Sequence, residues 1–102
     1  MLDNFQNWII EVKGKLQEKG VETEEVNVVD AKTSDNPSIT VHHYLPEKFI
    51  GLITLWETNT AYVEVLDYSS GDTVMTQHVQ LQTNSDFYEV FNDYLAAMSK
   101  VN

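Results

Sequence analysis

The side chains of this chain that could do chemistry are three histidines and many carboxylates. In a strand, His42 and His43 point to opposite faces, whereas His42 could share a face with His78 and Glu64 as a metal or acid–base cluster. No metal-ligand spacing such as H-E-x-x-H is present, and neither is a nucleophile elbow. We therefore interpret the histidines as surface or half-buried residues. We predict no enzyme activity, no metal and no cofactor.

Two missing residue types narrow the chemistry further. The chain contains no cysteine, which excludes a disulfide, a thiolate nucleophile and a cysteine zinc site. It also contains no arginine, the residue that usually clamps a phosphate or carboxylate substrate through two parallel hydrogen bonds. Function by binding is therefore favoured over function by catalysis.

The charge of the chain is strongly one-sided. The chain has sixteen acidic residues and six lysines, which give a formal net charge of −10. No cation lies between Lys48 and Lys100, a stretch that carries seven carboxylates: Glu57, Glu64, Asp67, Asp72, Asp86, Glu89 and Asp93. This balance argues against nucleic acid and against an anionic membrane surface. It favours a basic protein partner, although a solvated acidic surface that only maintains solubility is the alternative.

Length and composition predict one domain over residues 1–102. The chain has 102 residues, of which 42% are hydrophobic, enough for one modest core. The N-terminus lacks the pattern of a signal peptide, and no apolar run approaches the ~20 residues of a membrane span. We expect a cytoplasmic protein.

Hydrophobic periodicity predicts an α+β fold, an antiparallel β-meander of four or five strands flanked by N- and C-terminal helices. Apolar residues at three- and four-residue steps predict a first helix over Leu2–Leu16, with Gly20 as its stop. A last helix is predicted from a cap near Asp86 to Met98. The predicted strands are Ser38–Tyr44, Phe49–Trp56, Ala61–Tyr68 and Thr73–Leu81, with a short edge strand within Glu24–Asp30 as the fifth.

The connections between these strands are hairpin-sized and set the expected register. The loop Ser69–Gly71 ends on a glycine where a three-residue hairpin needs a left-handed residue. A loop of Thr58–Thr60 would place Leu55 opposite Val63. Both loops keep the apolar residues together on one face, as the period of two in a strand requires.

The two faces of the predicted sheet differ in composition. Aliphatic residues at odd-numbered positions form the face that the helices would cover. The even-numbered face mixes aromatic, aliphatic and acidic residues, as an interface core does. The pattern leaves open whether this face is exposed or covered by one of the helices. The predicted partner-binding residues are Trp56, Tyr62, Glu64, Tyr68, Asp67 and Asp72.

Several short strings resemble a known family. They are Asn36–Val41, Lys48–Glu57, Glu64–Asp67, Ser70–Val74 and a closing helix that begins at Asp86-Phe87. Together they resemble the TriTu family of immunity proteins from bacterial polymorphic toxin systems, over residues 36–98. The resemblance implies steric neutralisation of a cognate ADP-ribosyltransferase toxin that modifies elongation factor Tu, and it assigns no binding residues. The alternative is an acidic intracellular binding module or adaptor with an unrelated partner.

Overall fold

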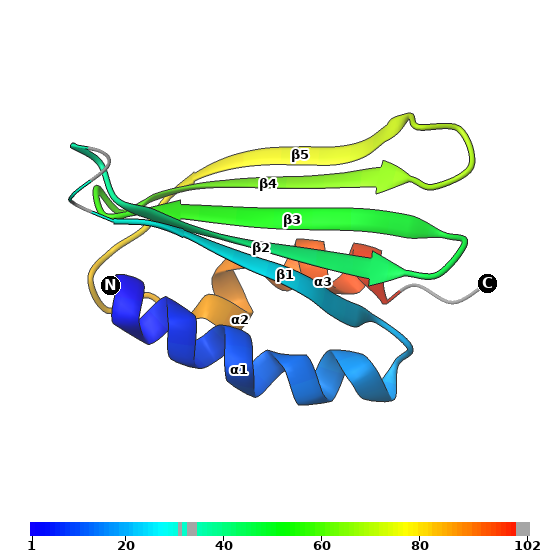
Figure 1. Ribbon diagram of the computed structural model, residues 1–102, viewed down its shortest axis with the longest axis horizontal. Helices are drawn as coiled ribbons and strands as arrows, with labels where there is room; N and C mark the ends of the chain where they lie inside the picture. The colour runs from blue at the N-terminus through cyan, green and yellow to red at the C-terminus, as the bar shows by residue number, and fades with distance from the viewer. Residues whose placement is uncertain (31, 33–34, 100–102) are drawn as a thin grey trace.

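The protein consists of a sheet layer and a helix layer (Figure 1). Over residues 1–30, 32 and 35–99, which the computed structural model describes, five antiparallel strands form one sheet and three helices pack beside it. This arrangement confirms the predicted α+β meander. The elements are α1 (Leu2–Glu18), β1 (Glu22–Val29), β2 (Ser38–Leu45), β3 (Phe49–Trp56), β4 (Thr60–Asp67), β5 (Thr73–Gln80), α2 (Phe87–Val90) and α3 (Asn92–Met98).

Helix α1 forms because its apolar residues recur once per turn and face the sheet. Its buried residues are Phe5, Trp8, Ile9, Val12 and Leu16. The helix ends at Glu18, and the chain then reverses into β1 through Gly20, which has a φ of 83°. Glycine adopts this left-handed backbone conformation at little energetic cost, because it has no Cβ. The predicted stop at Gly20 therefore agrees with the structure.

The prediction of a single C-terminal helix is wrong, because the segment divides into α2 and α3 at Phe91. The first turn packs the rings of Phe87 and Phe91 against α1, where both approach Phe5. The second segment places Tyr94 over the sheet instead. The change of backbone direction at Phe91 allows α2 to pack against α1 and α3 to pack against the sheet. The predicted cap is correct, since Asp86 accepts a hydrogen bond from the backbone N–H of Tyr88 at 2.9 Å.

The strands follow chain order, β1-β2-β3-β4-β5, and each pairs antiparallel with the next. The predicted pairing of Leu55 with Val63 is wrong, because Leu55 lies opposite Ala61. The turn is tighter than expected: Asn59 takes the left-handed position with a φ of 65°, and β4 already begins at Thr60. The predicted register is wrong by two residues. Because this is an even number, every side chain still points to the predicted face.

All three helices lie on the same side of the sheet, as Figure 1 shows. The core fills the space between them and the odd-numbered residues of the central strands. Its fully buried apolar sheet residues are Val41, Ile53, Leu55, Val63 and Val65. The alternative in which each sheet face carries one helix is therefore wrong, and the even-numbered face is open. Among the helices of the described chain, none is both long and apolar enough to cross a membrane.

Candidate functional site

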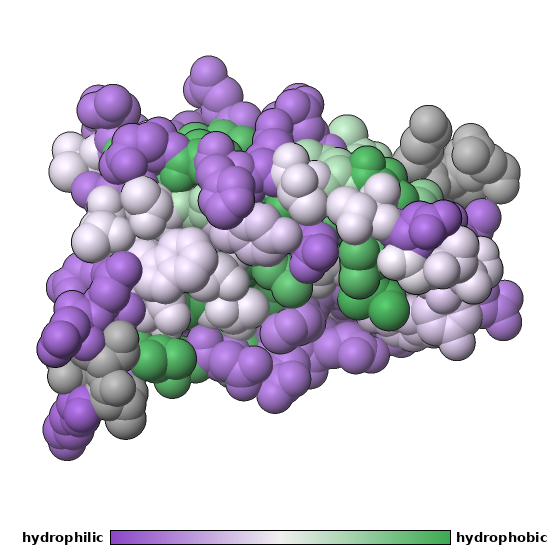
Figure 2. All heavy atoms as spheres, turned by 90° about the horizontal axis from the view of Figure 1, so that it is seen from above, coloured by the Kyte–Doolittle hydropathy of each residue, from purple (hydrophilic) through white to green (hydrophobic). Residues whose placement is uncertain are grey.

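The open sheet face is the candidate site. It is built by every second residue of β2 to β5, and strand pairing aligns these residues across the sheet. We call this surface the open face, and its residues are Thr40, His42, Tyr44, Ile50, Leu52, Thr54, Trp56, Tyr62, Glu64, Leu66, Tyr68, Thr76 and His78. Seen from above, apolar and weakly polar side chains gather over the middle of this face with a few hydrophilic ones among them, and hydrophilic side chains predominate around the rim (Figure 2).

One end of the open face is aromatic. Trp56 closes β3, and Tyr62 pairs with Thr54 on the neighbouring strand, so Trp56 and Tyr62 are diagonal neighbours. The ring of Tyr62 also contacts that of His78, with centroids 4.9 Å apart. Trp56 and Tyr62 are half-buried: the sheet fixes them in place and leaves part of each ring exposed. Rigid, partly exposed aromatic rings of this kind are suited to anchor a protein interface.

The opposite end of the face carries a second aromatic pair. Tyr68 follows β4, and its N–H donates to the carbonyl of Lys48 at 2.9 Å, which continues the ladder by one residue. Its ring lies 5.8 Å from that of Tyr44 on β2. Tyr68 and the adjacent Ile50 are both exposed. The structure thus brings Tyr68 onto the same face as Trp56, but at its other end.

Glu64 occupies the centre of the open face. It lies between Leu52 on β3 and Thr76 on β5. It is half-buried, and it is the one carboxylate among the open-face residues. A carboxylate among apolar neighbours is a strong acceptor for a lysine or arginine that displaces its water, because a charged hydrogen bond gains strength where water is excluded. Glu64 would therefore confer charge preference on an otherwise apolar contact.

The two predicted aspartates do not belong to this group. Asp67 and Asp72 lie at the β4–β5 turn, where the N–H of Asp67 donates to the carbonyl of Asp72 at 2.8 Å. The carboxylate of Asp67 accepts hydrogen bonds from the hydroxyl and the N–H of Ser69 and the N–H of Ser70. These hydrogen bonds lower the pKa of Asp67, and the bond from the Ser69 hydroxyl has the largest effect. Asp67 therefore organises a turn that Gly71 completes in the predicted left-handed conformation, with a φ of 75°.

The histidine cluster considered from the sequence does not form. His42 lies on β2 and His78 on β5, three strand spacings apart, or about 14 Å. Glu64 lies on β4, between them, and is two strands from His42. One ion cannot bridge such distances, so the acid–base or metal interpretation of these three residues is excluded by geometry.

His43 is a residue whose importance the sequence did not indicate. It points into the core, as its position next to His42 predicts, and it is fully buried. Its Nδ1 and the hydroxyl oxygen of Tyr94 are 2.6 Å apart and share a hydrogen bond. Burial, with a smaller effect of neighbouring His42, lowers the pKa of His43 from 6.5 to about 4. Burial likewise raises the pKa of Tyr94. The pair is neutral at physiological pH and joins α3 to β2.

Strand β1 extends the open face with an acidic margin that the sequence did not indicate. A β-bulge between Thr23 and Glu25 turns Glu25 toward this face, where it pairs with His42. Glu24 and Glu25 line a pocket of about 210 Å³ together with Tyr44 and Ile50. Alternation alone could not place these carboxylates, because a bulge changes the parity of the strand.

Comparison with known proteins identifies one family. The family model described as immunity protein TriTu matches residues 3–97, almost the whole chain. The match confirms the resemblance of the short strings and extends it to α1 and β1. No curated protein matches the chain.

Proposed function

Because this chain belongs to the TriTu family of immunity proteins, we propose that it neutralises a cognate toxin by covering it with the open face. The proposed partner is the basic catalytic domain of an ADP-ribosyltransferase toxin that modifies elongation factor Tu, as the sequence resemblance implies. The proposed place of action is the cytoplasm, where that target works.

The observation that carries the proposal is the absence of any helix over the open face in the described chain (Figure 2). Side chains such as Trp56 and Tyr62 are held in place and half-buried, with part of each ring still accessible. Burying such aromatic groups against a partner gains free energy from apolar area, with little entropy lost on ordering them. Immobilised aromatic side chains at the centre of a contact are the usual anchors of protein interfaces.

Charge supports a basic partner. The chain has a formal net charge of −10, and Glu64 sits in the middle of the open face with Glu25 at its margin. These carboxylates would meet lysine or arginine side chains of the toxin. Complementary charge would also speed the association of the two proteins and disfavour binding to other proteins that are acidic.

Steric occlusion requires no chemistry from the immunity protein. A toxin whose catalytic or target-binding surface lies against the open face cannot engage its substrates. The affinity of the complex then decides the protection, and catalytic residues are not needed. This mechanism agrees with a site built from aromatic, aliphatic and acidic side chains.

Co-expression with the cognate toxin tests the proposal. The wild-type protein should restore growth and keep elongation factor Tu unmodified, as mass spectrometry of the factor would show. The double variant Trp56→Ala/Glu64→Lys should fold but fail to protect. Glu89→Lys, an exposed charge reversal on α2 in the helix layer, is the matched control and should protect fully. Failure of the wild type to rescue growth would contradict toxin neutralisation. Full protection by the folded double variant would contradict the open face as its site.

A further inference from the structure

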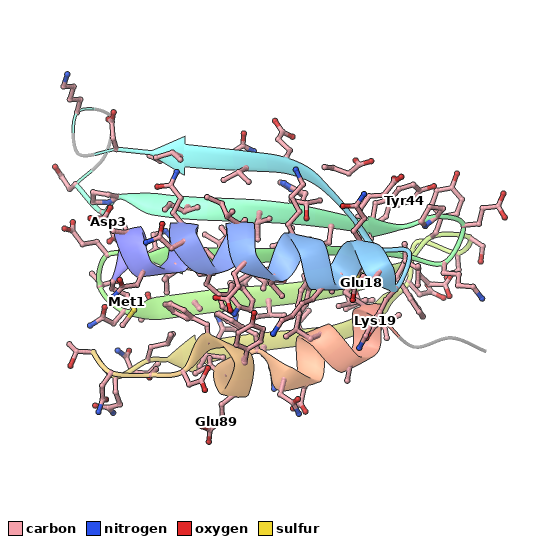
Figure 3. All side chains as sticks on the ribbon, turned by 90° about the horizontal axis from the view of Figure 1, so that it is seen from below. Met1, Asp3, Glu18, Lys19, Tyr44 and Glu89 are labelled. Atoms are coloured by element: carbon pink, nitrogen blue, oxygen red, sulfur yellow. The ribbon has the colours of Figure 1, made fainter. Side chains whose placement is uncertain are left out.

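The outer edge of β1 combines exposed backbone with exposed apolar side chains. Val26 and Val28 pair with Val41 and Ile39 on β2, which are buried beneath the helices. They therefore point to the helix side, yet they are 40% and 57% exposed. Figure 3 shows the reason: seen from below, α1 lies under the middle of the sheet and leaves β1 outside its flank.

Helix α1 adds a further apolar group to this edge. Ile10 is 69% exposed and lies three and seven residues before Lys13 and Gln17, so the three share one side of the helix. Lys13 and Gln17 line a pocket together with Glu22–Glu24 of β1, which shows that this side faces the strand. We define the β1 flank as Ile10, Val26 and Val28, three of the seven large exposed hydrophobic residues of the described chain.

The second half of β1, Val26–Val29, lacks the usual protection of a sheet edge, because the β-bulge and the glutamates of this strand lie in its first half. Natural edge strands are kept from pairing with other chains by charged residues, by proline, by β-bulges or by being very short. The strand β1 spans eight residues, none of them lysine or proline. Its acidic residues lie in the first half, at Glu22, Glu24 and Glu25, and its second half is apolar apart from Asn27. The edge is thus divided into an acidic part and an apolar part.

We propose that the outer edge of β1 accepts an extended segment of the cognate toxin as a sixth strand. This inference rests on the proposed function, and it adds a second contact surface to the open face. The segment carries lysine or arginine where it meets Glu22–Glu25 and apolar residues where it meets the β1 flank. Backbone hydrogen bonds to the edge supply affinity, and the alternating side chains supply specificity.

Charge argues for this occupant and against a second copy of the same chain. Two β1 edges paired antiparallel, as the strands of this sheet are, would set the acidic half of each copy against the apolar half of the other. The glutamates would gain no cationic partner, and two chains that each have a formal net charge of −10 repel each other. A basic segment removes this repulsion and gains ion pairs instead.

The geometry of an added strand also connects the two surfaces. Its side chains would alternate between the two sides of the sheet. One set would continue the open face beyond Glu25, and the other would cover Val26, Val28 and Ile10 on the helix side. A toxin that docks on the open face can therefore contact the edge of the sheet on both of its sides.

The test compares matched substitutions on the two edge strands. Val28→Lys places a charge on β1 where the proposed segment carries apolar residues, so binding would bury an unpaired ammonium group, whereas in the free protein the position is 57% exposed. Gln77→Lys is the control, because Gln77 lies on the opposite edge strand, β5, and pairs with the buried Val63, which places it on the helix side and away from the open face. Binding to a catalytically inactive toxin domain is measured by calorimetry, and folding by thermal melting. We expect Val28→Lys to weaken binding at least about tenfold and Gln77→Lys to change it less than about twofold.

Each outcome has one meaning. Unchanged binding by folded Val28→Lys would overturn the proposal, and so would equal losses for the two lysine variants. Should Val28→Lys fold poorly, Glu24→Lys, an exposed substitution in the acidic half, must weaken binding in the same direction. No binding by the wild type would instead contradict the proposed function. If Val28→Lys converts a wild-type dimer to a monomer in sedimentation, the occupant is a second copy and the proposal is wrong.

Discussion

The two tryptophans of this chain lie in opposite environments, which makes them a matched pair of probes. Trp8 is 5% exposed and packs against the rings of Phe5, Phe87 and Phe91, with centroid distances of 5.5–5.8 Å. Trp56 lies half-buried on the open face, where no helix covers it in the described chain. Their truncation to alanine should therefore affect different properties of the protein.

We expect Trp56→Ala to change the free energy of unfolding by less than about 1 kcal/mol and to weaken toxin binding by about 2 kcal/mol or more. Trp8→Ala should instead cost about 3–5 kcal/mol of stability, because it leaves a cavity among aromatic rings. Thermal melting and calorimetry on both variants measure the difference. A destabilised Trp56→Ala protein that binds the toxin normally would remove Trp56 from the interface.

His43 should make stability depend on pH. Its folded pKa of about 4 lies below the unfolded value of 6.5, so the unfolded chain takes up the proton first as pH falls. The contribution of His43 is complete above pH 6.5 and is lost as pH falls toward 4. The loss between pH 7 and pH 5 should be about 2 kcal/mol.

Urea unfolding at pH 7 and pH 5 measures this loss. The variant His43→Leu should show a much smaller difference between the two pH values, because it has no group to protonate in the core. His78→Gln, on an exposed position of β5, should retain the full difference. An equal pH dependence in wild type and His43→Leu would show that other groups cause it.

At the scale of elements, the sequence determined which way the strand residues point. Alternation placed Trp56, Tyr62 and Glu64 on one face, and the register error at Asn59 left this result intact because it was an even number of residues. The side on which the helices lie could not be predicted in this way. The even-numbered face also holds aliphatic residues such as Ile50 and Leu52, so apolar content alone does not exclude a helix there.

The features that the sequence did not reveal depend on contacts between distant segments. The break at Phe91 follows from aromatic packing against α1, and the bulge before Glu25 follows from pairing with β2. The exposure of Val28 reflects where α1 lies in the helix layer. Local periodicity contains none of this information.

Helix α3 packs on the sheet at a glycine, and this contact gives a prediction at the same scale. A Cβ at Gly51 would lie 2.6 Å from the sulfur of Met98 and 2.7 Å from the hydroxyl of Tyr94. Gly51→Ala should therefore displace α3 and cost about 1–3 kcal/mol of stability.

Gly14 provides the matched control, since nothing lies within 4 Å of a Cβ built there in α1. Gly14→Ala should stabilise the protein by about 0.5–1 kcal/mol, because alanine is the better helix former. Chemical unfolding of both variants gives the comparison. A Gly51→Ala protein as stable as wild type would show that α3 can shift without loss of packing.

At the scale of the whole molecule, the hydrophobic core and the proposed toxin-binding face lie on opposite sides of one sheet. The helices cover the apolar face, and the open face remains available with an acidic margin at β1. The charge imbalance was visible in the sequence and predicted a basic partner. The toxin itself could not be deduced from it, because complementary shape and charge are shared by many protein pairs.

The net charge of −10 should control how fast the toxin is captured. Charges steer two proteins together over roughly one Debye length, which is about 8 Å at physiological ionic strength and shrinks as salt is added. Raising the salt concentration from 50 to 500 mM should therefore slow association by roughly tenfold, while dissociation changes less, because the close contacts of the complex are screened less. Stopped-flow mixing with an inactive toxin domain measures both rates. The variant Glu64→Gln should show a weaker salt dependence than Glu89→Gln, since Glu64 lies on the open face and Glu89 in the helix layer. An association rate indifferent to salt would show that the acidic surface serves solubility and not recognition.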